Sequence, residues 1–334
     1  MKVIITGSAG FVGSHLVEHL LKNTDWDIVG LDSFKHRGDA LRVNGDPGRY
    51  EMFTCDLGTP ISTRLANKIG KVDYFLNVAS DSHVDRSITD PVPFVQNNVN
   101  LILHTLEYAR VAKPKMFLQV STDEVYGAAP EGTDHAEWSS IVPSNPYSAS
   151  KAAQEAIAVS YWRTFNVPLT IVNCMNMVGE RQDPEKYLPL LISKISRGET
   201  VKIHGTADYI GKRKYLHTRN LSDGILFLVN KTIPTLYKDG HNILPDRYNI
   251  VGDVELDNLQ LAQVVADIMN KPLKYELVDF HSARPGHDRR YSLDGTKIAN
   301  LGWRAPIDFK ESLTRTIDWT LKNQEWLEEI CPGM

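Results

Sequence analysis

Two short stretches of the sequence carry side chains that could do chemistry, and both lie within residues 121–151. The first, Ser121-Thr122-Asp123-Glu124, offers hydroxyls and two adjacent carboxylates. The second, Tyr147-Ser148-Ala149-Ser150-Lys151, places a phenol and an amine four residues apart. On a helix this spacing puts both groups on one face, a turn apart. An ammonium held there would favour the phenolate and lower the pKa of Tyr147 from about 10, which would make the tyrosine a general base.

Each stretch also has a purely structural interpretation. A tyrosine and a lysine at this spacing also occur on exposed helical turns, and Thr122-Asp123-Glu124 could be a solvated loop that caps a helix. The preceding sequence favours a functional role. Residues 115–120 form an apolar run of strand length, so the carboxylates that follow are expected at the carboxyl end of a strand. Open α/β sheets bind their ligands at that end.

The elements that must position these groups alternate between strand and helix patterns. Buried strands are predicted at residues 3–6, 28–31, 50–54, 74–78, 117–120 and 169–172. Helices are predicted through Leu16, Val17, Leu20 and Leu21, and at about 60–69, 92–112 and 147–165. Strands separated by helical crossovers make an α/β fold, here a Rossmann-type doubly wound parallel sheet.

A glycine pattern follows the first predicted strand. Gly7, Gly10 and Gly13 would allow a tight turn, backbone approach to a pyrophosphate and close helix packing. Asp32 lies 19 positions after Gly13, at the end of the second strand. A carboxylate there hydrogen-bonds an adenosine ribose 2′-hydroxyl and repels a 2′-phosphate, which favours NAD over NADP, although the basic residues 35–37 lie close by. Asp56 is either an adenine-side contact or the cap of a loop.

The composition excludes several classes of protein. A formal net charge of −4 and a pI near 6.3 give no basic field for nucleic acid or anionic lipid. No apolar run approaches the about 18 residues of a membrane span, and the N-terminus leads directly into a strand pattern. Cys55, Cys174 and Cys331 are scattered and lack metal-ligand spacing. We expect a cytoplasmic protein without a bound metal, a membrane anchor or a nucleic-acid partner.

Together, the glycine pattern, Asp32, Thr122, Tyr147 and Lys151 resemble the extended short-chain dehydrogenase/reductases that act on nucleotide sugars. Within this family the chain is most similar to the dTDP-glucose 4,6-dehydratase branch, from residue 1 to about residue 325. The most discriminating motif is residues 122–127, Thr-Asp-Glu-Val-Tyr-Gly, because the paired acids separate dehydratases from epimerases and simple dehydrogenases. The runs at 82–88, 173–176, 184–190 and 284–291 are similar to the same branch.

The resemblance implies an NAD-dependent dehydration of a nucleoside-diphosphate glucose, dTDP-glucose above all, to a 4-keto-6-deoxy sugar. Tyr147 would take the proton of the 4-hydroxyl, Thr122 would share that hydrogen bond, and Lys151 would hold the nicotinamide ribose. Glu124 would remove the C5 proton, and Asp123 would protonate the departing 6-hydroxyl. Burial and mutual repulsion can push the pKa values of two such carboxyls apart. Hydride would return to C6, so NAD would remain bound as a catalytic group.

The resemblance also implies the remaining contacts. The cofactor would be contacted by Gly7, Gly10, Phe11, Val12, Gly13, Asp32, Asp56, Leu57, Ala79, Tyr147 and Lys151. The substrate would be contacted by Ser82, Thr122, Asn176, Lys186, Arg213, Arg284 and His287, whose cationic members suit a diphosphate. His83 is either a substrate contact or a structural residue, and His15 is expected to be structural.

The family resemblance extends to domain organisation. An NAD-binding Rossmann domain is expected at 1–175 plus about 217–252, and a smaller, interwoven nucleotide-sugar-binding domain at about 176–216 plus 253–334. The predicted helices at 92–112 and 147–165 are similar to those through which the family forms homodimers by a four-helix packing.

Three segments depart from the family pattern, all on the substrate side. Residues 176–180 are Asn-Met-Val-Gly-Glu where Asn-Asn-Tyr-Gly-Pro is usual. Residues 213–215 are Arg-Lys-Tyr where Arg-Asp-Trp is usual, after two extra residues near Gly211-Lys212, and residues 251–254 replace a Gly-Gly-x-Asn pattern. These departures bear on the choice of nucleotide and sugar.

Other activities remain open at this level. A UDP-glucose 4,6-dehydratase would share all of the chemistry. A UDP-glucuronate decarboxylase or a 4-epimerase would keep Tyr147 and Lys151 but would not need the two acids. An inactive NAD-binding scaffold would need none of the reactive residues.

Overall fold

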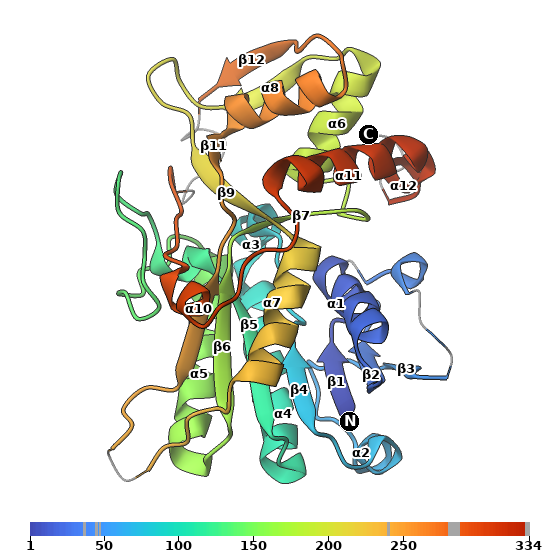
Figure 1. Ribbon diagram of the computed structural model, residues 1–334, viewed down its shortest axis with the longest axis vertical. Coiled ribbons are helices and arrows are strands. Elements are labelled where there is room, and N and C mark those ends of the chain that lie inside the picture. The colour runs from blue at the N-terminus through green and yellow to red at the C-terminus, as the bar shows by residue number, and fades with distance from the viewer. Residues whose placement is uncertain (36–37, 44–45, 47, 239–240, 280–287, 331–334) are drawn as a thin grey trace.

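A seven-stranded parallel sheet occupies the lower part of the molecule in Figure 1. The computed structural model describes residues 1–35, 38–43, 46, 48–238, 241–279 and 288–330. The sheet has the order β10-β6-β5-β4-β1-β2-β3, and its strands are β1 (Lys2–Thr6), β2 (Asp27–Asp32), β3 (Tyr50–Thr54), β4 (Tyr74–Asn77), β5 (Met116–Thr122), β6 (Leu169–Cys174) and β10 (Asp246–Ile250). The strand order reverses at the neighbouring strands β1 and β4, and such switch points are where these sheets bind ligands.

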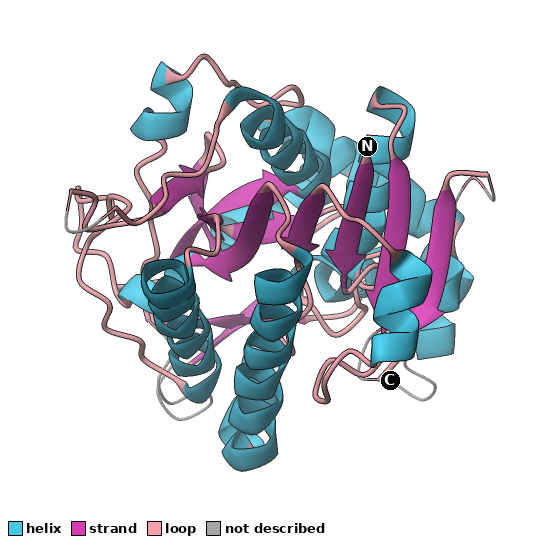
Figure 2. Ribbon diagram, turned by 90° about the horizontal axis from the view of Figure 1, so that it is seen from below, coloured by secondary structure: helices cyan, strands magenta, loops and turns pink. Residues whose placement is uncertain are grey.

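Helices cover both faces of this sheet, as the view from below in Figure 2 shows. Successive strand residues face opposite sides, so β1 contributes Val3 and Ile5 to one core cluster and Ile4 to the other. The first cluster is covered by α1 (Phe11–Asn23) and α7 (Thr218–Lys231). The second is covered by α4 (Pro91–Ala112) and α5 (Pro146–Phe165). The shorter helices of this part are α2 (Thr63–Ile69), α3 (Val84–Thr89) and α10 (Thr296–Asn300), with the 3-10 turns η1 (Ala40–Arg42) and η2 (Asp123–Tyr126).

A smaller part lies beyond the carboxyl ends of the sheet strands, at the top of Figure 1. It contains a three-stranded sheet in the order β11-β9-β7 and a two-stranded sheet of β12 and β8. Its strands are β7 (Asn176–Val178), β8 (Val201–His204), β9 (Lys212–His217), β11 (Glu255–Asp257) and β12 (Tyr275–Val278), and its helices are α6 (Tyr187–Arg197), α8 (Asn258–Ile268), α11 (Phe309–Lys322) and α12 (Gln324–Ile330). A separate core of buried Leu, Ile, Val and Ala side chains from α6, α8 and α11 holds this part together.

The predicted Rossmann-type sheet and its predicted elements are confirmed, with small shifts at their ends. α5 begins one residue early because Asn145 and Ser148 form a reciprocal capping box and Pro146 fits the first helical position, where no N–H is needed. α2 begins at Thr63 because the Ser62 hydroxyl accepts a hydrogen bond from Leu65 N. None of the helices among these described residues is long and apolar enough to cross a membrane.

Candidate active site

A cavity of about 680 Å³ opens at the carboxyl ends of the sheet strands, between the sheet and the smaller part. Every predicted site residue that the structure describes lines it: Gly7, Gly10, Phe11, Val12, Gly13, Asp32, Asp56, Leu57, Ala79, Ser82, Thr122, Asp123, Glu124, Tyr147, Lys151, Asn176, Lys186 and Arg213. Arg284 and His287 lie outside the described residues. The parallel sheet therefore brings residues separated by up to about two hundred positions to one cavity.

The turn between β1 and α1 allows a ligand to approach the backbone closely. Gly7 has a φ of +67°, which only glycine adopts without strain, and its N–H donates to Leu31 O at 2.8 Å. A Cβ at Gly13 would lie 2.0 Å from Gly7 O, so any side chain there would push α1 away from the turn. Gly10, Phe11, Val12 and Gly13 at the start of α1 line the cavity, and the unpaired N–H groups of a first helical turn suit a pyrophosphate.

The Asp32 carboxylate is fixed at the end of β2 by two backbone hydrogen bonds. Its Oδ2 accepts from Ala9 N and its Oδ1 from Phe34 N, both at 2.9 Å, and the residue is only 7% exposed. A charge held so firmly suits a ribose hydroxyl and disfavours a phosphate. Of the neighbouring basic residues, Lys35 pairs with Asp56 at 2.5 Å, while 36 and 37 lie outside the described part of the chain.

Asp56 has both of the properties that the sequence left open. Its Oδ1 accepts from Gly58 N at 3.0 Å, which makes it a loop cap, and it also lines the cavity. The turn after β1, the acid after β2 and this loop together fit an adenine dinucleotide. Lys151 and Tyr147 line the other end of the same cavity.

The end of β5 places the two acids. Thr122 leaves the strand and caps η2, with its hydroxyl accepting from Glu124 N at 3.3 Å and donating to Asp123 Oδ1 at 2.9 Å. Asp123 Oδ2 is buried without a hydrogen-bond partner among the described residues. Glu124 Oε2 accepts from Asn145 Nδ2 at 3.3 Å. Thr122 is thus a helix cap and a member of the site at once.

The two acids differ electrostatically. Burial, followed by the negative charge of Glu124, raises the pKa of Asp123 to about 7. Burial also raises the pKa of Glu124, and the Arg213 guanidinium and the Asn145 amide act in the opposite direction. At neutral pH a proton is therefore available on Asp123, and Oδ2 is the free oxygen that can carry it.

Tyr147 stands in the first turn of α5, where its N–H donates to Ser87 Oγ at 3.1 Å and its ring meets Phe94 edge-on. Burial, and after it the charge of Glu124, raises the pKa of Tyr147 well above the ordinary value of 10.0, while a hydrogen bond with Thr122 acts to lower it. The expectation that Lys151 lowers the pKa of Tyr147 is therefore wrong for the protein without a bound cofactor. Burial of the phenol is the largest cause of this shift.

The orientation of Lys151 explains this result. Its Nζ donates to Val120 O at 2.9 Å and to Gln154 Oε1 at 2.7 Å, and the residue is 4% exposed. Burial lowers the pKa of Lys151 to about 8, against the opposing charge of Glu155. An ammonium has three hydrogens, so the third is available to a ligand in the cavity.

A buried layer behind the site was missed at the sequence level. Asn173 Nδ2 donates both to Thr122 O at 3.0 Å and to Glu155 Oε1 at 2.8 Å. Glu155 in turn pairs with Arg247 at 2.6 Å, with both side chains almost fully buried. The spacing of Glu155 four residues after Lys151 was the available signal, since it places both on one helix face. This layer fixes the carbonyl group of Thr122, the residue that precedes the two acids.

Cationic side chains reach the cavity from the smaller part. Arg213 donates to Arg289 O at 3.0 Å and to Asp288 O at 2.7 Å, and it stacks over the Tyr291 ring at 4.4 Å. These contacts hold its guanidinium toward the two acids, whose pKa values it acts to lower. Lys186 Nζ donates to Ser82 O at 3.4 Å, which links the two walls of the cavity.

The loop after β4 meets the segment before α6 through charged groups. His83 Nε2 lies 3.3 Å from Glu185 Oε1, and Arg86 lies 3.8 Å from both Glu185 and Asp81. His83 also accepts from Arg86 N and so caps α3. This residue therefore has a structural role and lines the cavity as well.

The far end of the cavity is formed by residues for which the sequence offered no signal. Tyr187 OH donates to Asn258 O at 2.8 Å, and Tyr215 OH to Asn258 Oδ1 at 3.4 Å. These three residues lie on α6, β9 and α8, which are distant in the sequence. Only the packing of these elements brings them together.

Comparisons with known proteins agree with this geometry. A family model described as GDP-mannose 4,6 dehydratase matches residues 4–316. The chain is 32% identical over 359 residues to a dTDP-glucose 4,6-dehydratase of Shigella flexneri, covering 100% of this chain and 96% of the relative. It is 35% identical over 337 residues to a protein of the same name from Streptomyces antibioticus, covering 99% and 95%.

A solved structure is also similar over the whole chain. It is the crystal structure of DesIV, a dTDP-glucose 4,6-dehydratase from Streptomyces venezuelae, with NAD and TYD bound. The TM-score is 0.88 at 32% identity, and the match covers 99% of this chain and 100% of the other.

Proposed function

The chain belongs to the GDP-mannose 4,6 dehydratase family, and we propose that it is an NAD-dependent lyase that converts dTDP-glucose to its 4-keto-6-deoxy derivative. The observation that carries this proposal is the placement of Asp123, Glu124 and Tyr147 around one cavity. Oxidation at C4 needs one proton acceptor, here the phenol, together with NAD as the hydride acceptor, whereas loss of water also needs a base for the C5 proton and an acid for the 6-hydroxyl. Such a product belongs to deoxysugar biosynthesis.

NAD fits the cofactor end of the cavity. The N-terminus of α1, with Gly7, Gly10 and Gly13, would hold the pyrophosphate, and Asp32 would hold the adenosine ribose. The remaining hydrogen of Lys151 Nζ would go to the nicotinamide ribose. When bound, NAD supplies a hydride acceptor for C4, and its reduced form supplies the hydride for C6.

Proton transfer at the sugar is assigned to Tyr147 and Thr122. We propose that Tyr147 receives the 4-hydroxyl proton and that the Thr122 hydroxyl shares this hydrogen bond. Because burial raises the pKa of Tyr147, the phenolate needs the positive charge of the cofactor and of Lys151 to form near neutral pH. The tyrosine and the cofactor therefore act together.

Elimination of water is assigned to the two acids. A 4-ketone makes the C5 proton acidic, and Glu124 is the proposed base that removes it. Asp123 is the proposed acid that protonates the departing 6-hydroxyl, and its pKa of about 7 supports this role.

The nucleotide end of the cavity is assigned to the smaller part. Segments 176–216 and 253–334 are proposed to bind the nucleotide sugar, except around α10, whose Ile298 packs with the core of the Rossmann part. Lys186 and Arg213, with Arg284 and His287, would meet the diphosphate. Residues 1–175 and about 217–252 would bind NAD.

Two further properties are proposed. The enzyme is expected to be a cytoplasmic homodimer that pairs α4 and α5 with the same helices of a second copy. The dimer proposal rests on the similarity of these helices to those through which the family forms homodimers.

The test is to incubate the purified protein separately with dTDP-glucose and UDP-glucose in deuterated water. We expect the 4-keto-6-deoxy product from dTDP-glucose, with solvent deuterium at C5. A faster reaction with UDP-glucose would change the nucleotide assignment but keep the chemistry. A 4-epimer without loss of water would refute the dehydratase assignment.

A further inference from the structure

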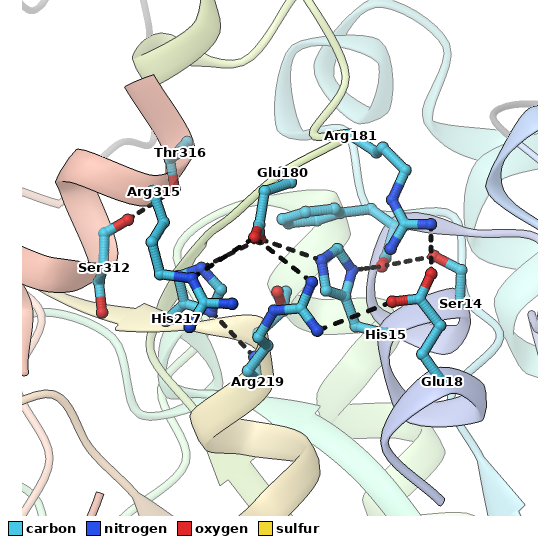
Figure 3. A network of polar contacts seen from close by, with 12 residues as sticks. Ser14, His15, Glu18, Glu180, Arg181, His217, Arg219, Ser312, Arg315 and Thr316 are labelled. Atoms are coloured by element: carbon cyan, nitrogen blue, oxygen red, sulfur yellow. Dashed lines mark hydrogen bonds and ion pairs between the residues drawn. The ribbon is translucent and has the colours of Figure 1, made fainter. Parts of the chain in front are cut away.

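A buried polar cluster joins the two parts of the molecule just outside the cavity (Figure 3). We call His15, Glu180, His217 and Arg219 the Glu180 cluster. Glu180 Oε2 lies 3.5 Å from His15 Nε2 and 3.2 Å from His217 Nε2, and Glu180 Oε1 lies 3.3 Å from Arg219 Nη2. Both imidazoles are fully buried. Three elements, α1, the loop after β7 and the start of α7, therefore meet at one carboxylate.

Backbone contacts assign the protons of the two imidazoles. His217 Nδ1 accepts from Arg219 N at 3.1 Å, so its proton is on Nε2, the nitrogen that faces Glu180. His15 Nδ1 lies 2.9 Å from Phe11 O, and a carbonyl only accepts, so this nitrogen carries the proton. A neutral His15 then presents the Nε2 lone pair to the Glu180 carboxylate. A second proton would convert this contact into a charge-assisted hydrogen bond.

The surrounding charges come from every element packed on the cluster. Arg315 of α11 lies 3.8 Å from Glu180, and Arg181 and Arg219 both pair with Glu18 of α1. His15 and His217, followed by Arg219, hold the pKa of Glu180 well below its ordinary range despite burial. Burial lowers the pKa of His15, with Glu180 opposing and Arg181 adding to the effect. Glu180 is therefore charged, and His15 is the group that exchanges a proton.

The cluster is connected to both ends of the cavity. Glu180 lies in the segment 176–186, of which Asn176, Met177, Gln182 and Lys186 line the cavity. His15 lies on α1, whose first turn lines the cofactor end. A carboxylate at position 180 thus joins the substrate-facing segment to His217 and Arg219, and it also binds the cofactor helix when His15 is protonated.

We propose that Glu180 is a positioning residue that holds segment 176–186 in its substrate-binding conformation, and that protonation of His15 strengthens this attachment. The inference rests on the proposed function for the identity of the bound sugar nucleotide. The glutamate stands where the family pattern has proline, so this chain replaces a stiff turn with a polar anchor.

The kinetic test uses Glu180→Ala and Glu180→Gln, with Glu51→Gln as the matched control. Glu51 is an exposed carboxylate that pairs with Lys68 at 3.2 Å, and neither residue contacts the cluster. Glu180→Ala should raise KM for dTDP-glucose about tenfold, the effect of one lost charge-assisted hydrogen bond, while kcat changes less than about threefold. Glu180→Gln should recover part of the loss, because an amide oxygen still accepts from His217. Glu51→Gln should match the wild type.

The pH dependence separates positioning from general destabilisation. Burial lowers the pKa of His15 below 6.5, so His15 takes up its proton only on clear acidification, and the KM ratio of Glu180→Ala to wild type should be larger at about pH 5 than at about pH 8. An unchanged KM with a lower kcat, or the same ratio at both pH values, would overturn the proposal.

Hydrogen exchange gives a readout that does not depend on substrate. In the wild type, protection of residues 176–186, corrected for intrinsic exchange, should be higher at about pH 5 than at about pH 8, and Glu180→Gln should remove this difference. Equal protection at both pH values would refute the proposal even if the alanine variant does not fold. A failure of dTDP-glucose turnover with the expected exchange pattern would refute the substrate assignment alone.

Discussion

Thr122 donates a hydrogen bond from its hydroxyl to Asp123 Oδ1 at 2.9 Å, so the last residue of β5 orients the acid that follows it. With Oδ1 occupied, Oδ2 is the oxygen left to hold a proton. Glu124 is held separately, through Asn145. Two adjacent residues of the same chemistry thus meet different partners, which is what allows one to act as an acid and the other as a base.

The first prediction separates the two acids by isotope exchange. Glu124→Gln should still oxidise C4, so enzyme-bound NADH should accumulate in a single turnover while C5 exchange with solvent disappears. Asp123→Asn should also accumulate NADH but keep more C5 exchange, because removal of the proton precedes departure of the hydroxyl. Each substitution should slow product formation by about 10²–10⁴-fold. Stopped-flow absorbance and NMR measure the two signals.

Tyr147→Phe is the control for this pair of variants. It should block the oxidation itself and give no NADH signal. If Glu124→Gln exchanged C5 normally and Asp123→Asn did not, the two assigned roles would be reversed.

The second prediction concerns pH. Burial raises the pKa of Asp123 to about 7, above its unfolded value of 3.8, so the acid form is present below about pH 7 and is lost as the pH rises through that value. The rate of the elimination step in single turnover should therefore fall above about pH 7. In Asp123→Asn this alkaline decrease should be missing. A decrease that persists in the asparagine variant would assign it to another group.

The third prediction concerns the cofactor. Asp32→Ala should weaken NAD binding by about 1–3 kcal/mol, because it removes a charge-assisted hydrogen bond to the ribose. The loss of contacts to Ala9 N and Phe34 N contributes to this value, so Asp32→Asn, which keeps one acceptor oxygen, is the matched comparison. Calorimetric titration measures both affinities. An unchanged affinity in Asp32→Ala would place the ribose contact on another residue.

The fourth prediction concerns stability. Arg247→Met leaves the Glu155 carboxylate buried without its guanidinium partner and should lower the free energy of unfolding by about 3–5 kcal/mol. Adding Glu155→Gln removes the unpaired charge and should recover part of that loss. Denaturant unfolding measures all three proteins. If the double variant were less stable than Arg247→Met, the cost would come from packing and not from the unpaired charge.

The residues of the cavity were predictable because the parallel sheet by itself brings most of them together. Apolar runs fix the strands, and the carboxyl ends of parallel strands meet at one edge, so the polar residues that follow Thr6, Leu31 and Val120 must converge. The four-residue spacing alone predicted that Tyr147 and Lys151 lie on one face of a helix.

What the sequence could not provide depends on contacts between distant elements. The buried amine of Lys151 donates to Val120 O, and no local pattern encodes that choice. Glu155 and Arg247 are 92 positions apart, and His15 and Glu180 are on different parts of the molecule. Their partners follow only from tertiary packing, as does the effect of burial on the pKa of Tyr147.

The fate of the C4 hydrogen tests the proposed reaction most directly. The protein as purified, without added NAD, should convert dTDP-glucose that carries deuterium at C4 into a 4-keto-6-deoxy product with that deuterium at C6, because the cofactor is reduced and reoxidised within one catalytic cycle. NMR and mass spectrometry of the product locate the label. Strict dependence on stoichiometric NAD, with NADH accumulating and no label at C6, would contradict the dehydratase and indicate a net dehydrogenase.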